Sequence, residues 1–474
     1  MECSLHAQGL KTVHGSHKTI KFGLHIVTWN VGTAAPPDDI TALLQLEAQM
    51  QETDMYVIGL QELNSKVPSF LIDMVFYDPW TVFITNFLAP LGYVKVSSIR
   101  MQGLLLLICV KHQHLPYICD LQTSYTRTGL FGYWGNKGAV AARLSVYGHL
   151  LCFLNCHLPA HLHNSSQRIS TFQRILAVLR FPGRPPPSVL DHDLLFWFGD
   201  LNFRIADHGL HFIRDTIGKK RFHLLWDKDQ LNKAKQAEPV LQGFLEGQLL
   251  FKPTYKFNLD STDYDTSEKR RKPAWTDRIL WRVKAACPDR GTGSGAGSQW
   301  SDARKPIAVT LNIYDSQMQY GVSDHKPVLA TFSLELERRM TQPLVELQAE
   351  GEWVPGKDAI ISYCPAQDYS SSSWDWIGLF KVGFRSPRDY VTYLWVKDDE
   401  LLVNEDVYQV FLNGEDVPEV AGDYILCYYS SNMDCIVGVS CPFQILPECA
   451  GSPLEMDART ETCDAQAHGD SDTC

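Results

Sequence analysis

The chain alternates short apolar runs with amphipathic segments from Leu24 to about Arg338, and this alternation restricts its fold more than any other feature. Strands and helices joined by short connections predict an α/β domain built from layers of sheet and helix. Two segments, Asp39–Gln51 and Gln167–Arg180, are predicted to be amphipathic helices. Eight apolar runs are predicted to be strands: Leu24–Trp29, Met55–Leu60, Gly103–Val110, Ala139–Val146, Leu150–Cys156, Leu194–Phe198, Ile279–Val283 and Val328–Leu334.

The pattern changes after Arg339. Residues 344–446 contain short alternating stretches rich in aromatic residues, with turn signals such as Asn413-Gly414 and no helical periodicity. This pattern predicts an all-β sandwich. The expected organisation is therefore an N-terminal segment 1–19, an α/β domain 20–338, a β-sandwich 344–446 and a polar, acidic tail 447–474 that is predicted to be disordered.

Charge and cysteine content limit the possible partners. The formal net charge of −11 argues against general adhesion to nucleic acid or to an anionic membrane, so any grip on phosphate must come from a local cluster of cations. The sequence shows neither a signal peptide nor an apolar run long enough for a transmembrane segment. Thirteen cysteines without paired spacing indicate reduced thiols in a cytosolic protein.

Five short segments place polar residues at the ends of apolar strands. Polar groups at strand ends converge on one rim when the strands share a sheet, so residues far apart in sequence can form one site. The five segments are Thr28-Trp29-Asn30, Gln61-Glu62, Cys156-His157-Leu158, Gly199-Asp200-Leu201-Asn202 and Ser323-Asp324-His325.

The residue types in these segments suit metal-assisted phosphate chemistry. Glu62, helped by the Asn30 amide, offers the hard oxygen ligands that Mg²⁺ prefers. Asp200 could orient or deprotonate an attacking water. Singly, each of these residues is more often structural, and it is their occurrence in five segments together that favours a site.

The same segments supply groups that can contact phosphate. Asn202 and His157 can donate hydrogen bonds to phosphate oxygens, and His325 paired with a carboxylate can stabilise charge that develops during transfer of a phosphoryl group. A lone histidine after a strand is usually a satisfied structural residue. The functional interpretation again depends on the set as a whole.

A basic run precedes one of the predicted strands. Lys269–Lys272 leads through Pro273 to Asp277, which stands at the start of the apolar stretch Ile279–Trp281. Cations beside a buried acid suggest a site that holds a polyanion and carries out chemistry next to it. The alternative is a solvated basic loop before an ordinary strand.

Taken together, the five segments resemble the endonuclease/exonuclease/phosphatase superfamily. Phe198–Arg204 and Pro273–Leu280 resemble the paired motifs of inositol polyphosphate 5-phosphatases, and the resemblance covers about residues 20–338. It implies a four-layer α/β sandwich. Trp374–Phe380 and Ala421–Tyr424 resemble the SKICH domain, which implies an immunoglobulin-like sandwich that binds a protein partner.

The resemblance implies a role for each site residue. Glu62 is the principal Mg²⁺ ligand with Asn30 nearby, and Asp200 positions and activates water. The remaining implied catalytic residues are Asn202 and His157 on the scissile phosphate, the Asp277–His325 dyad, and Asp324 in support of the metal and phosphate site. The implied substrate-binding residues are Tyr255, Lys256, Lys269 and Arg271 for the 4-phosphate and Asn136 and Lys137 for the 1-phosphate, and the implied membrane-contacting residues are Phe131 and Trp134.

The function implied is Mg²⁺-dependent removal of the 5-phosphate from phosphatidylinositol 4,5-bisphosphate and 3,4,5-trisphosphate, with soluble inositol tris- and tetrakisphosphates as further substrates. Such an enzyme damps phosphoinositide signalling to insulin/Akt pathways and actin. It would be cytoplasmic and peripherally associated with phosphoinositide-bearing membranes, at plasma-membrane ruffles or the endoplasmic reticulum. Two alternatives stay open: a nuclease, which requires a broad basic surface, and an adaptor that has lost catalysis.

Overall fold

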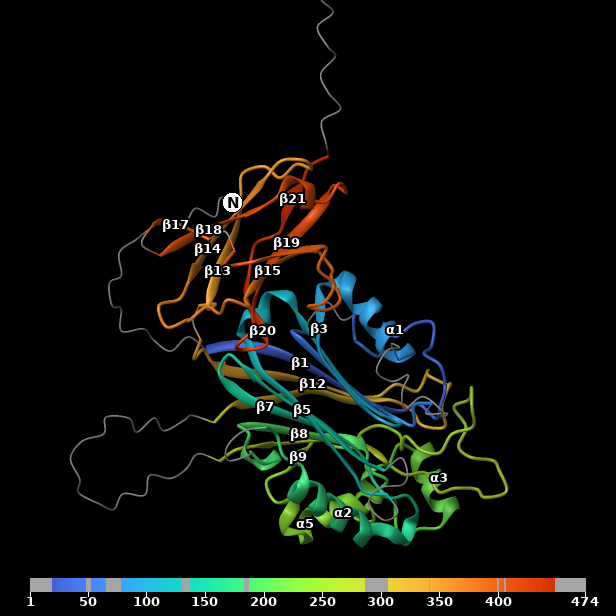
Figure 1. Cartoon of the computed structure of the whole chain (residues 1–474). Coiled ribbons are helices and arrows are strands. Elements are labelled where there is room, and N and C mark those ends of the chain that lie inside the picture. The colour runs from blue at the N-terminus through green and yellow to red at the C-terminus, as the bar shows by residue number, and fades with distance from the viewer. Residues whose placement is uncertain are drawn as a thin grey trace, which may run out of the picture.

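Two six-stranded sheets packed face to face form the larger part of the molecule, and a smaller all-β sandwich follows (Figure 1). This computed structural model describes residues 19–47, 53–64, 78–129, 137–182, 187–285, 306–340, 342–398, 400–404 and 406–447. No helix within these ranges is long and apolar enough to cross a membrane.

The first sheet has the strand order β11-β12-β1-β2-β4-β3, and the second has the order β5-β6-β7-β8-β10-β9. The first contains β1 (Thr19–Asn30), β2 (Met55–Gln61), β3 (Tyr93–Met101), β4 (Leu104–Lys111), β11 (Ala308–Ser316) and β12 (Val328–Glu337). The second contains β5 (Ile118–Arg127), β6 (Gly138–Val146), β7 (His149–His157), β8 (Leu194–Asp200), β9 (Leu245–Glu246) and β10 (Asp277–Val283).

The main core lies between the two sheets. Phe153 and Phe196 stack with ring centroids 5.5 Å apart, and Phe196 meets the edge of Phe332 from the first sheet at 5.0 Å. Every residue of β2 and β8 is buried. Strands covered on both faces must be apolar on both faces, which is why these segments are near-continuous apolar runs.

Helices cover the two outer faces and complete four layers. On the second sheet, Phe172 of α2 stacks on Trp197 with ring centroids 3.7 Å apart. On the first, Trp80 of α1 meets the edge of Trp29 at 5.4 Å. The helices are α1 (Pro79–Leu88), α2 (Ser165–Val178), α3 (Leu210–Gly218), α4 (His223–Trp226) and α5 (Gln230–Ala237), with 3₁₀ helices η1 (Ala89–Leu91), η2 (His112–Tyr117), η3 (Leu162–Asn164), η4 (Val189–Asp191), η5 (Pro239–Leu241) and η6 (Gly414–Asp416).

All eight predicted strands are present, and the predicted helix at 167–180 is α2. The helix predicted over Asp39–Gln51 is wrong for its described part, because residues 41–47 form turns. Gln45 has a left-handed φ of 55°, which interrupts a helix. The carbonyls of Leu43 and Leu44 instead accept hydrogen bonds from the side chains of His25 and Tyr56.

Parallel pairing in the middle of each sheet brings the polar strand ends to one edge. β1 runs parallel to β2 with Asn30 opposite Gln61, and β7 runs parallel to β8 with His157 opposite Asp200. β10 is antiparallel to β8, so its first residue, Asp277, also lies opposite Asp200. The topology therefore collects these side chains at one end of the double sheet.

A buried pair of amides joins the two sheets just below that edge. The Gln61 side chain donates a 2.8 Å hydrogen bond to the Oδ1 atom of Asn155. The Nδ2 group of Asn155 donates to the carbonyls of Leu105 and Leu60 at 2.8 and 3.2 Å. Both amides are fully buried, so these bonds fix the relative position of the sheets.

The C-terminal sandwich has sheets of order β13-β14-β18-β17 and β16-β15-β19-β20, with β21 paired to β19. Its buried Asp375 accepts hydrogen bonds from the hydroxyls of Tyr369 and Tyr428 and from the backbone of Ser372 and Ser431. The strands are β13 (Val345–Glu350), β14 (Ala359–Pro365), β15 (Trp376–Lys381), β16 (Thr392–Trp395), β17 (Leu401–Asn404), β18 (Val407–Leu412), β19 (Gly422–Ser430), β20 (Cys435–Val439) and β21 (Phe443–Ile445).

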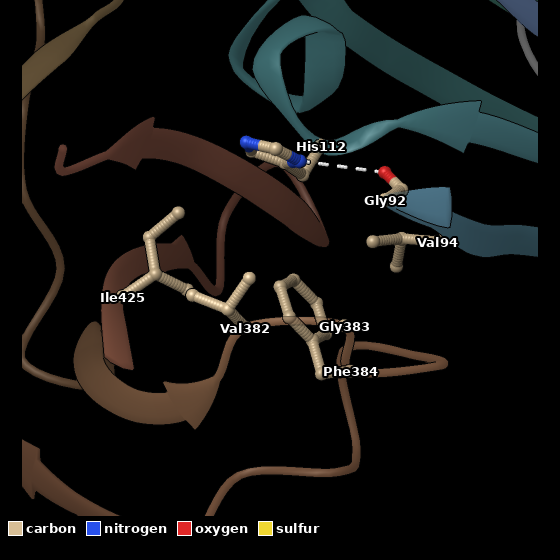
Figure 2. A pocket seen from close by; sticks show the side chains of 7 residues that line it. All are labelled: Gly92, Val94, His112, Val382, Gly383, Phe384 and Ile425. Carbon is tan, nitrogen blue, oxygen red and sulfur yellow. Dashed lines mark hydrogen bonds between the residues drawn. The ribbon is translucent and has the colours of Figure 1, made fainter. Parts of the chain in front are cut away.

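The sandwich docks on the end of the double sheet opposite the polar edge. Phe384 and Ile425 face Val94 across a small apolar hollow that Figure 2 shows from close by. The amide of Lys95 donates to the carbonyl of Arg385 at 2.8 Å. Apolar contact and backbone pairing together hold the two parts in one arrangement.

We predict that Asn155→Ala lowers the free energy of unfolding by about 2–4 kcal/mol. The substitution removes the hydrogen-bond partner of the Gln61 amide and of the Leu105 carbonyl, and it leaves a cavity. Chemical denaturation followed by tryptophan fluorescence measures the change. In the control Asn312→Ala, an exposed amide is lost and the change stays within about 0.5 kcal/mol. Equal effects in the two variants would contradict the role of the amide pair.

Candidate active site

Asp200, the last residue of β8, is the centre of the polar edge. Its carboxylate is buried and accepts hydrogen bonds from the Asn30 amide at 3.0 Å and from the Asn202 backbone at 3.1 Å. The Nε2 atom of His157 lies 3.2 Å from the same carboxylate. Asp200 thereby connects β1 of one sheet with β7 and β8 of the other.

Asp200 is ionised despite its burial. Burial alone would raise the pKa of its carboxyl group. The hydrogen bond from His157 and the positive field of His325 and Lys137 outweigh burial and hold the pKa of Asp200 well below its usual range. A carboxylate with so low a pKa is a weak base, and its natural role is to orient a hydrogen-bond donor such as water.

Glu62 presents the accessible carboxylate of the site. It adopts a left-handed φ of 57°, and its side chain is 37% exposed. The ligand atoms of Glu62, His157 and Asp200 lie within 4.8 Å of one another. Two carboxylates and an imidazole at this spacing fit a divalent cation.

The Lys137 ammonium lies among these three residues, in contact with the Nε2 atom of His157. Burial lowers the pKa of Lys137, while the charges of Asp200 and Glu62 oppose that shift. Burial and the ammonium together lower the pKa of His157, so its ring is neutral near pH 7. The cluster of acidic groups thus attracts positive charge from the chain itself, which agrees with a cation site.

His325 and Asp277 form a buried dyad. The Nδ1 atom of His325 lies 2.9 Å from the Oδ2 atom of Asp277, which also accepts from the hydroxyls of Thr254 and Thr276 at 2.7 and 2.8 Å. Burial would lower the pKa of His325, but the Asp277 charge and hydrogen bond raise it to about 9. The ring is therefore an imidazolium at neutral pH.

Neighbouring strand ends hold this histidine in place. The Trp29 indole donates to the His325 carbonyl at 3.0 Å, and the Ser323 hydroxyl donates to the Asn30 carbonyl at 2.7 Å. Asp324 lies at the rim, where its carboxylate pairs with Lys256 at 2.7 Å. Among the described residues, Asp324 is not part of the group that could hold a cation.

Arg204 is a site residue that the sequence reasoning did not identify. It donates to the side-chain and backbone oxygens of Asn202, whose Nδ2 group donates to the Leu158 carbonyl at 3.1 Å. Its guanidinium lies 4.2 Å from the ring of Tyr255, which in turn lies 4.6 Å from the ring of His325. The sequence feature that could have identified Arg204 is its place at the end of the Phe198–Arg204 motif.

A hollow of about 320 Å³ opens beside Tyr255 and Arg204 and is lined by the basic run. Arg204 and Tyr255 also contact the candidate catalytic residues, so they form the shared wall of the two regions. Buried Asp265 shapes the loop by accepting from the backbone of Ser267 and Arg271 at 3.0 and 2.7 Å. The lining residues are Ala160, His161, Leu162, Arg204, Ile205, Tyr255 and Lys269–Lys272.

The structure thus brings together most of the predicted site residues. Phe131, Trp134 and Asn136 lie outside the described residues. Lys137 lies beside His157, Asp200 and Glu62, although the resemblance implied contact with a more distant phosphate. Tyr255, Lys256, Lys269 and Arg271 lie at or beside the hollow.

Comparison with known proteins identifies the class. The chain matches Endonuclease/Exonuclease/phosphatase family 2 over residues 27–331 and the SKICH domain over residues 345–445. It is similar to a crystal structure of the inositol polyphosphate 5-phosphatase domain of SPsynaptojanin in complex with inositol (1,4)-bisphosphate and calcium ion. That likeness has 29% identity and a TM-score of 0.56, and it covers 68% of this chain and 87% of the other.

Curated relatives place the chain within that class. Inositol polyphosphate 5-phosphatase K of Mus musculus is 49% identical over 90% of each chain. Phosphatidylinositol 4,5-bisphosphate 5-phosphatase A of Homo sapiens is 50% identical over 90% of this chain, which spans 42% of that relative's length. The chain belongs to the inositol polyphosphate 5-phosphatase family, as the sequence motifs predicted.

We predict that Asp277→Asn lowers the pKa of His325 from about 9, because burial is then opposed only by the weaker charges of Asp200 and Asp324. Histidine-ring NMR titration of the folded protein measures this. Asp324→Asn, the control, lowers it less, since Asp324 contributes least of the three carboxylates. An unchanged titration in Asp277→Asn would contradict the dyad.

The same raised pKa sets a pH dependence of stability. Protonation of His325 is favoured in the folded state, so its stabilising contribution is complete below about pH 6.5 and is lost as the pH rises through about 9.

Proposed function

We propose that this chain is a Mg²⁺-dependent phosphomonoester hydrolase that removes the 5-phosphate of phosphatidylinositol 4,5-bisphosphate and 3,4,5-trisphosphate. The proposal rests on one observation: the candidate catalytic residues lie next to a basic hollow. Asp200, Glu62 and the Asp277–His325 dyad share a wall with a hollow lined by four consecutive cations. Family membership and the names of the relatives support the same reaction.

Glu62, with Asp200 and His157 beside it, is the proposed Mg²⁺ site, and Asn30 holds Asp200 in place. When bound, the ion neutralises charge on the phosphate and polarises it toward attack. The donor set agrees with such an ion because oxygen ligands dominate it.

Asp200 accepts a hydrogen bond from the attacking water and orients it toward phosphorus. Water adds to the phosphate, the bond from phosphorus to the inositol oxygen breaks, and the proton lost by water finally resides on the inositol hydroxyl. The imidazolium of His325 stabilises the negative charge that develops on the phosphoryl oxygens. Asn202 and His157 contact the same phosphate.

The basic hollow selects the substrate. Lys269 and Arg271, with Tyr255 at the wall of the hollow and Lys256 next to it in sequence, bind the neighbouring 4-phosphate. Arginine pairs with phosphate through two hydrogen bonds, and lysine supplies a point charge. Soluble inositol 1,4,5-trisphosphate and 1,3,4,5-tetrakisphosphate carry the same phosphate pair and are proposed as further substrates. The remaining proposals are a cytoplasmic enzyme at plasma-membrane ruffles or the endoplasmic reticulum and a damping effect on insulin/Akt and actin signalling.

We expect Asp200→Asn to reduce phosphate release from phosphatidylinositol 4,5-bisphosphate vesicles by about a thousandfold or more. Chelation by EDTA should abolish release, and added Mg²⁺ should restore it. The control Asp207→Asn changes an exposed carboxylate on the following loop and leaves the rate unchanged. Release by Asp200→Asn within tenfold of the parent rate would overturn the mechanism.

Lys269→Ala and Arg271→Ala should each raise KM about tenfold for a substrate with both 4- and 5-phosphates, because each variant loses a charged contact. A substrate with a 5-phosphate but no 4-phosphate should show little change. Lys219→Ala removes an exposed lysine elsewhere and serves as the control. Equal losses on both substrates would instead indicate a general positive field.

A further inference from the structure

The edge strand β17 of the C-terminal sandwich exposes an uninterrupted apolar stretch. Leu401, Leu402 and Val403 are 55%, 61% and 50% exposed. Among the described residues, β17 is the last strand of its sheet and pairs with β18 alone. In the part of the chain that the structure describes, no backbone hydrogen bond reaches its outer side. Figure 1 shows β17 on the side of the sandwich remote from α1.

Two of the other edge strands of the sandwich are covered. β20 lies against η2 of the catalytic domain, and β13 packs so closely on β20 that the Val345 carbonyl would meet a side chain at Gly438. The edge strand β16 is also exposed, but its surface carries aromatic rings that pack on one another: Tyr393 and Trp395 meet edge to face at 5.5 Å, and Tyr390 packs on Tyr393 at 5.1 Å. β17 has neither kind of protection within the described ranges.

Soluble proteins protect edge strands with lysine, proline or inward-pointing charge, because an open edge pairs with other chains. Residues 401–403 have none of these devices. The ladder to β18 is irregular between Leu402 and Asn404, so Leu401 and Leu402 offer the more regular part of the edge. An exposed apolar edge without lysine, proline or inward-pointing charge is a surface that an added strand can use.

Negative charge surrounds the apolar stretch. The sequence from 398 to 406 contains five acidic residues and no basic one. In the structure, Asp398 and Asp406 are exposed before and after β17. Glu400 is held in place by Lys397 at 2.6 Å and by the Tyr363 hydroxyl. A complementary segment therefore has an apolar centre with basic residues on both sides.

We propose that β17 is a docking edge for an extended segment of a partner protein, which adds to the sheet as a fifth strand and carries lysine or arginine on both sides of an apolar stretch. Backbone hydrogen bonds along Leu401–Asn404 provide binding, and the acidic residues around the strand select basic flanks. The catalytic edge lies at the far end of the double sheet, so a partner bound here leaves the active site open.

The test uses the full chain and two labelled ten-residue peptides. Each has alternating valine and threonine at its centre, with two lysines at each end in one and two glutamates at each end in the other. We expect the lysine peptide to bind in a fluorescence anisotropy titration and to protect the amides of residues 401–404 from hydrogen exchange. The glutamate peptide should bind at least about tenfold more weakly.

Leu402→Lys should weaken binding of the lysine peptide by at least about tenfold, because it places a like charge on the edge. The matched control Val420→Lys alters an equally exposed residue, 58% accessible, in the same domain and should not change binding. Circular dichroism and Tm confirm that both variants fold. If Leu402→Lys does not fold, the double variant Asp398→Lys/Asp406→Lys, which changes only exposed residues outside the strand, should abolish the preference for lysine flanks.

Three results would overturn the proposal. The first is the absence of peptide binding, and the second is binding that Leu402→Lys leaves unchanged or that protects residues outside 401–404. The third is a dimer in sedimentation that Leu402→Lys dissociates, which would assign this edge to a second copy of the chain.

Discussion

The active site depends on one buried carboxylate that must stay ionised. Asp200 lies at the meeting point of the two sheets, and burial of a charge is costly unless hydrogen bonds and opposite charge compensate. Asn30 supplies one hydrogen bond from the first sheet, His157 contacts it from the second, and the His325 imidazolium adds positive field. Asn30 and His157 end strands of different sheets, and His325 precedes β12, so the position of the sheets and the charge state of the site are coupled.

The dyad carries positive charge, and the candidate cation site carries negative charge. Asp277 keeps His325 protonated, while Glu62, Asp200 and His157 gather negative charge and lone pairs on the other side of the same opening. Arg204 contacts both regions. It donates a hydrogen bond to the Asn202 side chain, and it stacks on Tyr255 beside the dyad. A positive and a negative region a few ångströms apart suit a phosphate that must be bound tightly while water attacks it.

Much of the fold followed from local patterns. Strands buried on both faces, such as β2 and β8, are continuous apolar runs, and the motifs at their ends contain most of the candidate site. Segments decided by contacts distant in sequence were missed. Residues 41–47 have a helix-like composition, but His25 and Tyr56 bind their carbonyls and hold turns instead. β5 and β11 have exposed and half-buried residues along much of their length, so they lack a clear apolar signal.

The sequence by itself determined the chemistry, because the identity of the carboxylates, histidines and cations cannot depend on folding, and it determined which runs must be buried. Only the tertiary structure decided how these groups are used. It placed Lys137 against His157 at the candidate site, paired Asp324 with Lys256 at the rim, and left the apolar edge β17 open. Distances of 3–4 Å between residues more than a hundred positions apart arise from strand order and register, which no local pattern encodes.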